Sequence, residues 1–169
     1  MIHYLEAPNG FRADLARPWV FMAGGITNCP DWQKDLHQFL YTGMGPLAGN
    51  PATIHSFTLF NPRRENFPIH DPCASEEQIT WEHVGFKLAD IIVFWFAKGS
   101  LNPIVLYELG KHCMHPNIVV GCDPEYVRTQ DVVIQLRLMR PRLKVILGFE
   151  PFCAAVSVAI QLWGAEDER

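Results

Sequence analysis

The chain has 169 residues, of which 49% are hydrophobic and 19% are charged, and its formal net charge is -4. This length favours a single domain, here taken as residues 1–169, and the apolar fraction is sufficient for a sizeable core. The negative charge and the absence of a long basic run argue against duplex nucleic acid as a partner, because phosphate binding needs clustered lysine and arginine.

The expected location follows from the N-terminus and the cysteines. Residues 1–6 have neither the charged region nor the apolar region of a signal peptide. No apolar stretch reaches the roughly 18 residues that span a bilayer. The five cysteines are odd in number and scattered, without a C-x-x-C pair, which favours reduced thiols. We therefore expect a cytoplasmic protein that does not insert into a membrane.

Apolar strand-like runs alternate with helical patterns along the chain, and Gly, Pro and Asn occupy the turns. Five strand–helix alternations predict an α/β fold with a parallel sheet. The predicted elements, in chain order, are strand 20–23, helix 31–40, strand 57–60, a helix from Ser75 with a capping box to Gln78, strand 91–96, a helix with Asn102 as N-cap and Pro103 in its first turn, strand 117–120, helix 130–139, strand 143–147 and helix 151–163 followed by Gly164.

The loops that leave the predicted strands carry most of the candidate binding residues. Gly24 and Gly25 follow the first strand, and the run from Asn61 to Arg63 follows the second. Because the carboxyl ends of parallel strands meet at one edge of the sheet, we expect these loops to converge on the ligand.

Glu108 is the most informative single residue. It lies near the start of an apolar helix that follows the very hydrophobic strand 91–96. A carboxylate in such a place loses hydration, so it needs a partner or serves chemistry. The sequence leaves both open: an ion pair with Lys111 or His112 on the same helical face, or a nucleophile.

Glu82 is the second candidate carboxylate. It shares adjoining positions of one predicted helical face with Gln78 and Gly85. A glycine inside a helix costs about 1 kcal/mol relative to alanine, which indicates a close approach of backbone or ligand there. The alternative is an exposed carboxylate beside a packing glycine. Two carboxyl groups could divide the cleavage of a glycosidic bond between a nucleophile and an acid/base group.

Other residues carry weaker signals, each with a structural alternative. The loop 23–28 could present backbone N–H groups to an anion. Arg63 and Arg64 could hold a phosphate or carboxylate, or could pair with Glu65. Aromatic side chains could stack on a base or belong to the core; they are Trp81, Trp95 and Phe96.

Metal and cofactor sites are not predicted. His112, Cys113 and His115 have no second cluster to complete a tetrahedral set, and Cys122 has no adjacent histidine that would activate a thiol.

Several of these motifs together resemble the nucleoside 2-deoxyribosyltransferase-like family. The resemblance spans about residues 20–136, and the Glu-Leu-Gly run at 108–110 is its most specific part. The other matching segments are 20–25, 60–64, 78–82, 89–90, 94–96, 103–107 and 121–122. The family implies a flavodoxin-like three-layer sandwich with a five-stranded parallel sheet.

The resemblance also implies roles. Glu108 matches the nucleophile that attacks the sugar C1′, and Glu82 falls where the family has an aspartate that assists the leaving base. Asn102 falls where the transferases have a base-contacting aspartate, and the glycine loop matches the sugar-side loop. Asp131 falls near a residue that the family lends to the 5′-hydroxyl site of a neighbouring subunit. Phe21 stands where family members often carry a tyrosine.

The expected function is cleavage of the N-glycosidic bond of a nucleoside with 2-deoxyribosyl transfer to another nucleobase. The alternatives are a hydrolase of nucleoside 5′-monophosphates, with Arg63 or the glycine loop on the phosphate, and a nucleotide-binding module without turnover. A homo-oligomer is expected, with the apolar closing helix leaving area for an interface. The expected substrate-binding residues are Gly24, Gly25, Ile26, Asn61, Arg63, Trp81, Phe96, Asn102 and Asp131.

Overall fold

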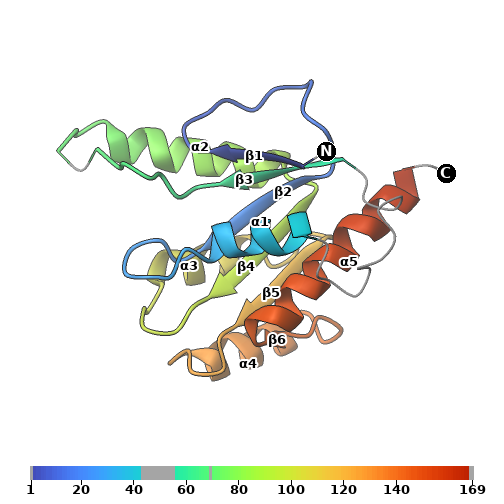
Figure 1. The fold of residues 1–169 in the computed structure, drawn as a ribbon. Coiled ribbons are helices and arrows are strands. Elements are labelled where there is room, and N and C mark those ends of the chain that lie inside the picture. Colours follow the sequence, from blue (N-terminus) through green and yellow to red (C-terminus); the bar gives the residue numbers. More distant parts are fainter. Residues whose placement is uncertain (1, 43–55, 69, 168–169) are drawn as a thin grey trace.

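The computed structural model describes residues 2–42, 56–68 and 70–167, which form a parallel sheet with helices on both faces (Figure 1). The sheet has six strands in the order β1-β3-β2-β4-β5-β6, and every pairing is parallel. The strands are β1 (Ile2–Glu6), β2 (Trp19–Gly24), β3 (Phe57–Asn61), β4 (Ile91–Phe96), β5 (Ile118–Cys122) and β6 (Ile146–Leu147). The α/β fold with a parallel sheet is thereby confirmed.

The sixth strand is the correction to the predicted five. β1 pairs with β3 over Ile2–Glu6 at the edge of the sheet, and all of its residues are only half-buried. A strand with so little burial lacks the continuous apolar run that marks the inner strands. When β1 is set aside, the remaining order corresponds to the 2-1-3-4-5 arrangement of flavodoxin-like sheets.

The helices cover the sheet in two layers. They are α1 (Trp32–Thr42), α2 (Ala74–Leu88), α3 (Pro103–His112), α4 (Thr129–Met139) and α5 (Phe149–Asp167). Apolar residues of α2, α3 and α4 pack on one face of the sheet, and those of α1 and α5 pack on the other. Alternate side chains of β4 enter the two cores, which explains why this strand is apolar at every position. In the described part of the chain, no helix has the length and hydrophobicity required to cross a bilayer.

Most element boundaries differ from the sequence prediction by one or two residues, and three differences are informative. The strand predicted over 143–147 is reduced to Ile146–Leu147, and Gly164 lies inside α5 rather than beyond its end. α2 begins at Ala74 without a side-chain cap, and no capping box forms between Ser75 and Gln78 among the described residues. The Gln78 amide nitrogen instead donates to the Pro62 carbonyl and to Glu82.

The closing helix α5 is apolar on two sides. Phe152, Val156 and Ile160 are almost fully buried against the sheet of their own chain, so these three residues belong to the core. Val158 and Leu162 of the same helix are exposed. Large exposed apolar side chains also occur on α3 and its flanks, at Leu101, Ile104, Tyr107 and Met114.

Gly85 is required by packing within α2. A Cβ at this position would overlap the Phe21 ring, which packs against Phe86 at a centroid distance of 4.4 Å. The close approach expected at this glycine is thus made by an aromatic side chain from β2. Gly110 in α3 is the opposite case, because a Cβ there would meet no heavy atom within 4 Å.

This contrast gives a matched pair of substitutions. Gly85→Ala should lower the free energy of unfolding by about 1–3 kcal/mol, because overpacking outweighs the better helix propensity of alanine. Gly110→Ala should raise it by up to about 1 kcal/mol, because only propensity changes. Urea unfolding of both variants measures the two effects. Equal shifts in the same direction would contradict the packing role of Gly85.

Candidate active site

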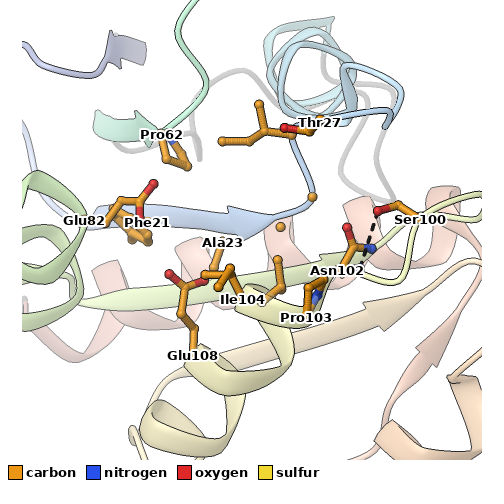
Figure 2. Close-up of a pocket in the computed structure, with 14 residues that line it drawn as sticks. Phe21, Ala23, Thr27, Pro62, Glu82, Ser100, Asn102, Pro103, Ile104 and Glu108 are labelled. Atoms are coloured by element: carbon orange, nitrogen blue, oxygen red, sulfur yellow. Dashed lines mark hydrogen bonds between the residues drawn. The ribbon is translucent and has the colours of Figure 1, made fainter. Parts of the chain in front are cut away.

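A cavity of about 250 Å³ lies at the carboxyl end of β2, beside the loop that follows β4 and the start of α3 (Figure 2). This is the edge of a parallel sheet at which α/β folds place ligands. The residues that line it are Phe21, Ala23, Gly24, Gly25, Ile26, Thr27, Pro62, Glu82, Ser100, Asn102, Pro103, Ile104, Val105 and Glu108.

α3 brings Glu108 to the cavity. Val105 and Leu109 are buried and fix the helix on the sheet, so the turn between them directs Glu108 toward the cavity. Figure 2 shows Glu82, from α2, and Glu108 on the same side of the cavity. The polar, uncharged residues Thr27, Ser100 and Asn102 lie on the other side (Figure 2).

Asn102 precedes α3, as predicted, but its side chain does not cap the helix. Its backbone is left-handed, with a φ of 48°, and its exposed fraction is 5%. The amide oxygen accepts a weak hydrogen bond from the Cys29 thiol at 3.5 Å, whereas the amide nitrogen has no partner among the described residues. A buried donor without a partner at a cavity wall is available to a ligand.

Gly25 allows the glycine loop to approach Asn102. A Cβ on Gly25 would overlap the Asn102 amide oxygen and the Cys29 sulfur. Any other residue at position 25 would therefore displace the loop or the asparagine.

Arg63 supports this loop through hydrogen bonds to its backbone. Its guanidinium donates to the backbone oxygens of Gly25, Cys29 and Pro30 at 3.4, 3.3 and 2.8 Å, and its Nε donates to Gln33 at 3.1 Å. Asp31 lies 3.4 Å from the same group. The Nη2 and Nε donors of Arg63 are thus used within the fold, where they support the loop.

Glu108 has no hydrogen-bond or ion-pair partner among the residues that the structure describes. Burial raises its pKa to about 8; the nearby Glu82 carboxyl adds to the rise, and Lys111 opposes it. The alternative of an ion pair is not observed among the described residues. The Lys111 ammonium lies over the Tyr107 ring, 5.4 Å from its centroid, and His112 stacks on Phe86 at 4.3 Å.

Glu82 has a different environment. Burial raises its pKa as well, but the hydrogen bond from Gln78 at 2.8 Å and the charge of Arg64 oppose the rise. Two carboxyl groups with unequal surroundings in one cavity are an arrangement suited to acid/base chemistry.

Six of the predicted site residues meet at this cavity: Gly24, Gly25, Ile26, Glu82, Asn102 and Glu108. The structure does not bring Asn61, Arg63, Trp81, Phe96 or Asp131 to it. Asn61 donates to the Tyr4 hydroxyl, and Trp81 donates to the Asn9 carbonyl while its ring packs on Phe11.

Phe96 and Asp131 also lie elsewhere. Phe96 is fully buried against Tyr126. Asp131 pairs with Arg128 at 3.5 Å and lines a separate groove between α3 and α4.

Thr27, Pro62, Ser100 and Ile104 also line the cavity, although they were not among the individually predicted site residues. Thr27, Pro62 and Ser100 belong to loops that leave β2, β3 and β4, and such loops were expected to converge on the ligand. In the part of the chain that the structure describes, no group of three or more histidine, cysteine, aspartate or glutamate side chains is placed to hold a metal ion.

Comparison with known families gives one match. A family model described as nucleoside 2-deoxyribosyltransferase like matches residues 17–126, more than half of the chain. The matched range includes every residue that lines the cavity. No curated protein matches the chain.

The burial of Glu108 predicts a pH-dependent effect on stability. Its pKa is raised in the folded state, so the folded protein keeps a proton there that the unfolded chain loses above about pH 4.5. The free energy of unfolding of the wild type should therefore fall as the pH rises from about 4.5 to about 8. Glu108→Gln should unfold with nearly wild-type stability at pH 5 but be more stable by about 1–3 kcal/mol at pH 9.

Denaturant unfolding at both values measures the difference. Glu150→Gln, at an exposed position on α5, serves as the control and should show no such dependence. A constant offset between Glu108→Gln and the wild type at all pH values would contradict the raised pKa.

Proposed function

The chain belongs to the nucleoside 2-deoxyribosyltransferase-like family, and from that premise we propose that it transfers a 2-deoxyribosyl group between nucleobases by breaking and re-forming an N-glycosidic bond. The observation that carries the proposal is the pair of half-buried carboxyl groups, Glu82 and Glu108, on one cavity at the strand ends. Retaining cleavage of a glycosidic bond uses two such groups, one as nucleophile and one as acid/base.

In the proposed reaction, the ionised Glu108 carboxylate attacks C1′ of the bound nucleoside. The C1′–N bond breaks, a C1′–O bond to Glu108 forms, and Glu82 delivers a proton to the departing nucleobase. A second nucleobase then attacks C1′ from the side of the first, returns its proton to Glu82 and releases Glu108. The same two carboxyl groups serve both half-reactions.

The remaining walls fit an uncharged sugar and base. Phe21, Ile26 and Pro62 supply apolar surface, and the glycine loop lets a sugar approach the backbone closely. The unpartnered amide nitrogen of Asn102 supplies a donor for a base or a hydroxyl group. Such a mixture of apolar wall and a few polar groups is typical of small-molecule sites.

The substrate-binding roles expected for residues away from the cavity change accordingly. Arg63 and Asn61 act through the fold, and Trp81 and Phe96 act through the core. Asp131 lies outside the cavity of its own chain, so in the proposal it contacts substrate only across an interface in a homo-oligomer.

Hydrolysis of nucleoside 5′-monophosphates is supported less well. The described residues that line the cavity include two carboxyl groups and no lysine, arginine or histidine. Arg63, the residue expected to hold the phosphate, donates to the glycine loop and to Gln33. A dianion close to a carboxylate is repelled unless a cation compensates. The cavity therefore favours a neutral nucleoside over a phosphorylated one.

Base exchange tests the central claim. The wild type incubated with a 2-deoxynucleoside and a second, distinguishable nucleobase should form the new nucleoside, as seen by liquid chromatography. Glu108→Ala should reduce the rate at least about 1,000-fold, because the nucleophile is lost. Glu150→Ala, at an exposed position on α5, is the control and should retain the wild-type rate.

Two results would separate the alternatives. Release of free base at the same rate without an acceptor would indicate a hydrolase. Absence of any released base from the wild type, together with unchanged nucleoside affinity in Glu108→Ala, would indicate a binding module.

Substrate charge provides an independent test. The kcat/KM for a 2-deoxynucleoside should exceed that for its 5′-monophosphate by at least about tenfold, which corresponds to about 1.4 kcal/mol of repulsion in the transition state. The preference should decrease at high salt if it arises from charge. A preference for the monophosphate would contradict the electrostatic argument.

A further inference from the structure

The two carboxyl groups of the cavity differ in their hydrogen bonds. Glu82 Oε1 accepts a hydrogen bond from Gln78 Nε2 at 2.8 Å, one helical turn earlier in α2. Glu108 accepts no hydrogen bond from the described residues. A hydrogen bond that is donated to a carboxylate stabilises its ionised form. The geometry therefore distinguishes an ionised member of the pair from a protonated one.

The Gln78 amide is fixed in this orientation. Its Nε2 also donates to the Pro62 carbonyl at 2.7 Å, so both N–H groups are used. An inverted amide would place its oxygen against the Pro62 carbonyl and the Glu82 carboxylate, which are both acceptors. Since Pro62 lines the cavity, Gln78 also holds Glu82 at a constant place relative to the cavity wall.

The surrounding charges act in the same direction. The Arg64 cation, from the segment after β3, stabilises the Glu82 carboxylate, while the cation that acts on Glu108 is Lys111 on α3. The Lys111 ammonium lies over the Tyr107 ring instead of pairing with Glu108. His83 on α2 and Lys111 and His115 act by their charges on His112 of α3, which stacks on Phe86. From β2, Phe21 and Ala23 face the cavity and do not titrate.

We propose that Gln78 is a positioning residue, which keeps Glu82 ionised and held in place so that the single proton of the carboxyl pair rests on Glu108 until substrate binds. The inference rests on the proposed function for its catalytic consequence. The described residues form no direct hydrogen bond between the two carboxyl groups, so in the first half-reaction the proton passes from the Glu108 carboxyl to the Glu82 carboxylate through a hydroxyl group of the bound substrate or a water molecule. It then passes from Glu82 to the departing nucleobase as the C1′–N bond breaks and the C1′–O bond to Glu108 forms. The proton that Glu108 loses on becoming a nucleophile is thus the same proton that the departing nucleobase receives. No acid other than the carboxyl pair is required.

Titration of the carboxyl carbons tests the resting position of the proton without any substrate. The protein is labelled with ¹³C at the glutamate carboxyl groups, and the signals are assigned from Glu82→Gln and Glu108→Gln. In the wild type, the Glu82 signal should respond in the first, more acidic step and the Glu108 signal in the second. Gln78→Met, which keeps the length of the side chain without the donor, should move the Glu82 step upward by about one pH unit. Unchanged steps in this variant, or Glu108 responding first in the wild type, would overturn the inference.

The pH dependence of kcat/KM tests the catalytic consequence. A pair that works with one proton gives a bell-shaped profile, in which rates fall at acid pH when Glu82 is protonated and above about pH 8 when Glu108 has lost its proton. Gln78→Met should move the acid limb upward and lower kcat/KM about tenfold at pH 6. A lower melting temperature with an unmoved profile would show a structural role only and would overturn the inference.

Two further variants make the test specific. Gln38→Met alters an exposed glutamine on α1, on the other face of the sheet, and should leave both the titration and the profile unchanged. Gln78→Glu keeps the shape of the side chain if Gln78→Met fails to fold, and it should raise the Glu82 step in the same direction. If the wild type exchanges no base, the proposed function fails, while the titration still decides where the proton rests.

Discussion

The partial burial of two carboxyl groups, Glu82 and Glu108, in one cavity is the constraint on which this site depends. Each charge that is removed from water raises the pKa of its group, and each carboxylate raises the pKa of the other. The fold supplies a hydrogen-bond donor and a nearby cation for Glu82, whereas the described residues donate no hydrogen bond to Glu108. In the proposed function, this asymmetry makes Glu82 the acid/base group and Glu108 the nucleophile. In a chain of this size, an arrangement that lowers stability is expected where function requires it.

The support for this pair comes from packing and backbone hydrogen bonds in and around the cavity wall. Arg63 donates hydrogen bonds to three backbone oxygens in the glycine loop and the residues that follow it. These bonds fix the cavity wall opposite the carboxyl groups. Phe21 enters the space left by Gly85, so β2 and α2 approach closely near Glu82. The apolar contacts of Val105 and Leu109 seat α3 on the sheet. Positions of the reactive groups are thus set by packing and by backbone hydrogen bonds, which are stiffer than contacts between exposed side chains.

The parts of the fold that have strong periodic signals were predictable from the sequence. β4 is apolar at all six positions, and the alternation of strands and helices predicted the parallel sheet. β1 was missed because an edge strand with half-buried residues has no such run. Glu82, Glu108 and the glycine loop were found because their residue types are unusual at those places. Arg63 was predicted to bind a ligand because the sequence shows a cation at a strand end but not the backbone oxygens that surround it. Gln78 gave a capping signal, and only the folded geometry reveals its bond to Glu82.

The contact between Gly25 and Asn102 links two positions that are 77 residues apart in the chain. The space for a Cβ at one is filled by the amide of the other, so the two sites share a single small volume. Homologous chains that replace Asn102 by a smaller residue gain room for a side chain at the position of Gly25. We therefore expect positions 25 and 102 to covary in an alignment of homologues. For protein engineering, this coupling means that the wall of the cavity is redesigned by changing both residues together.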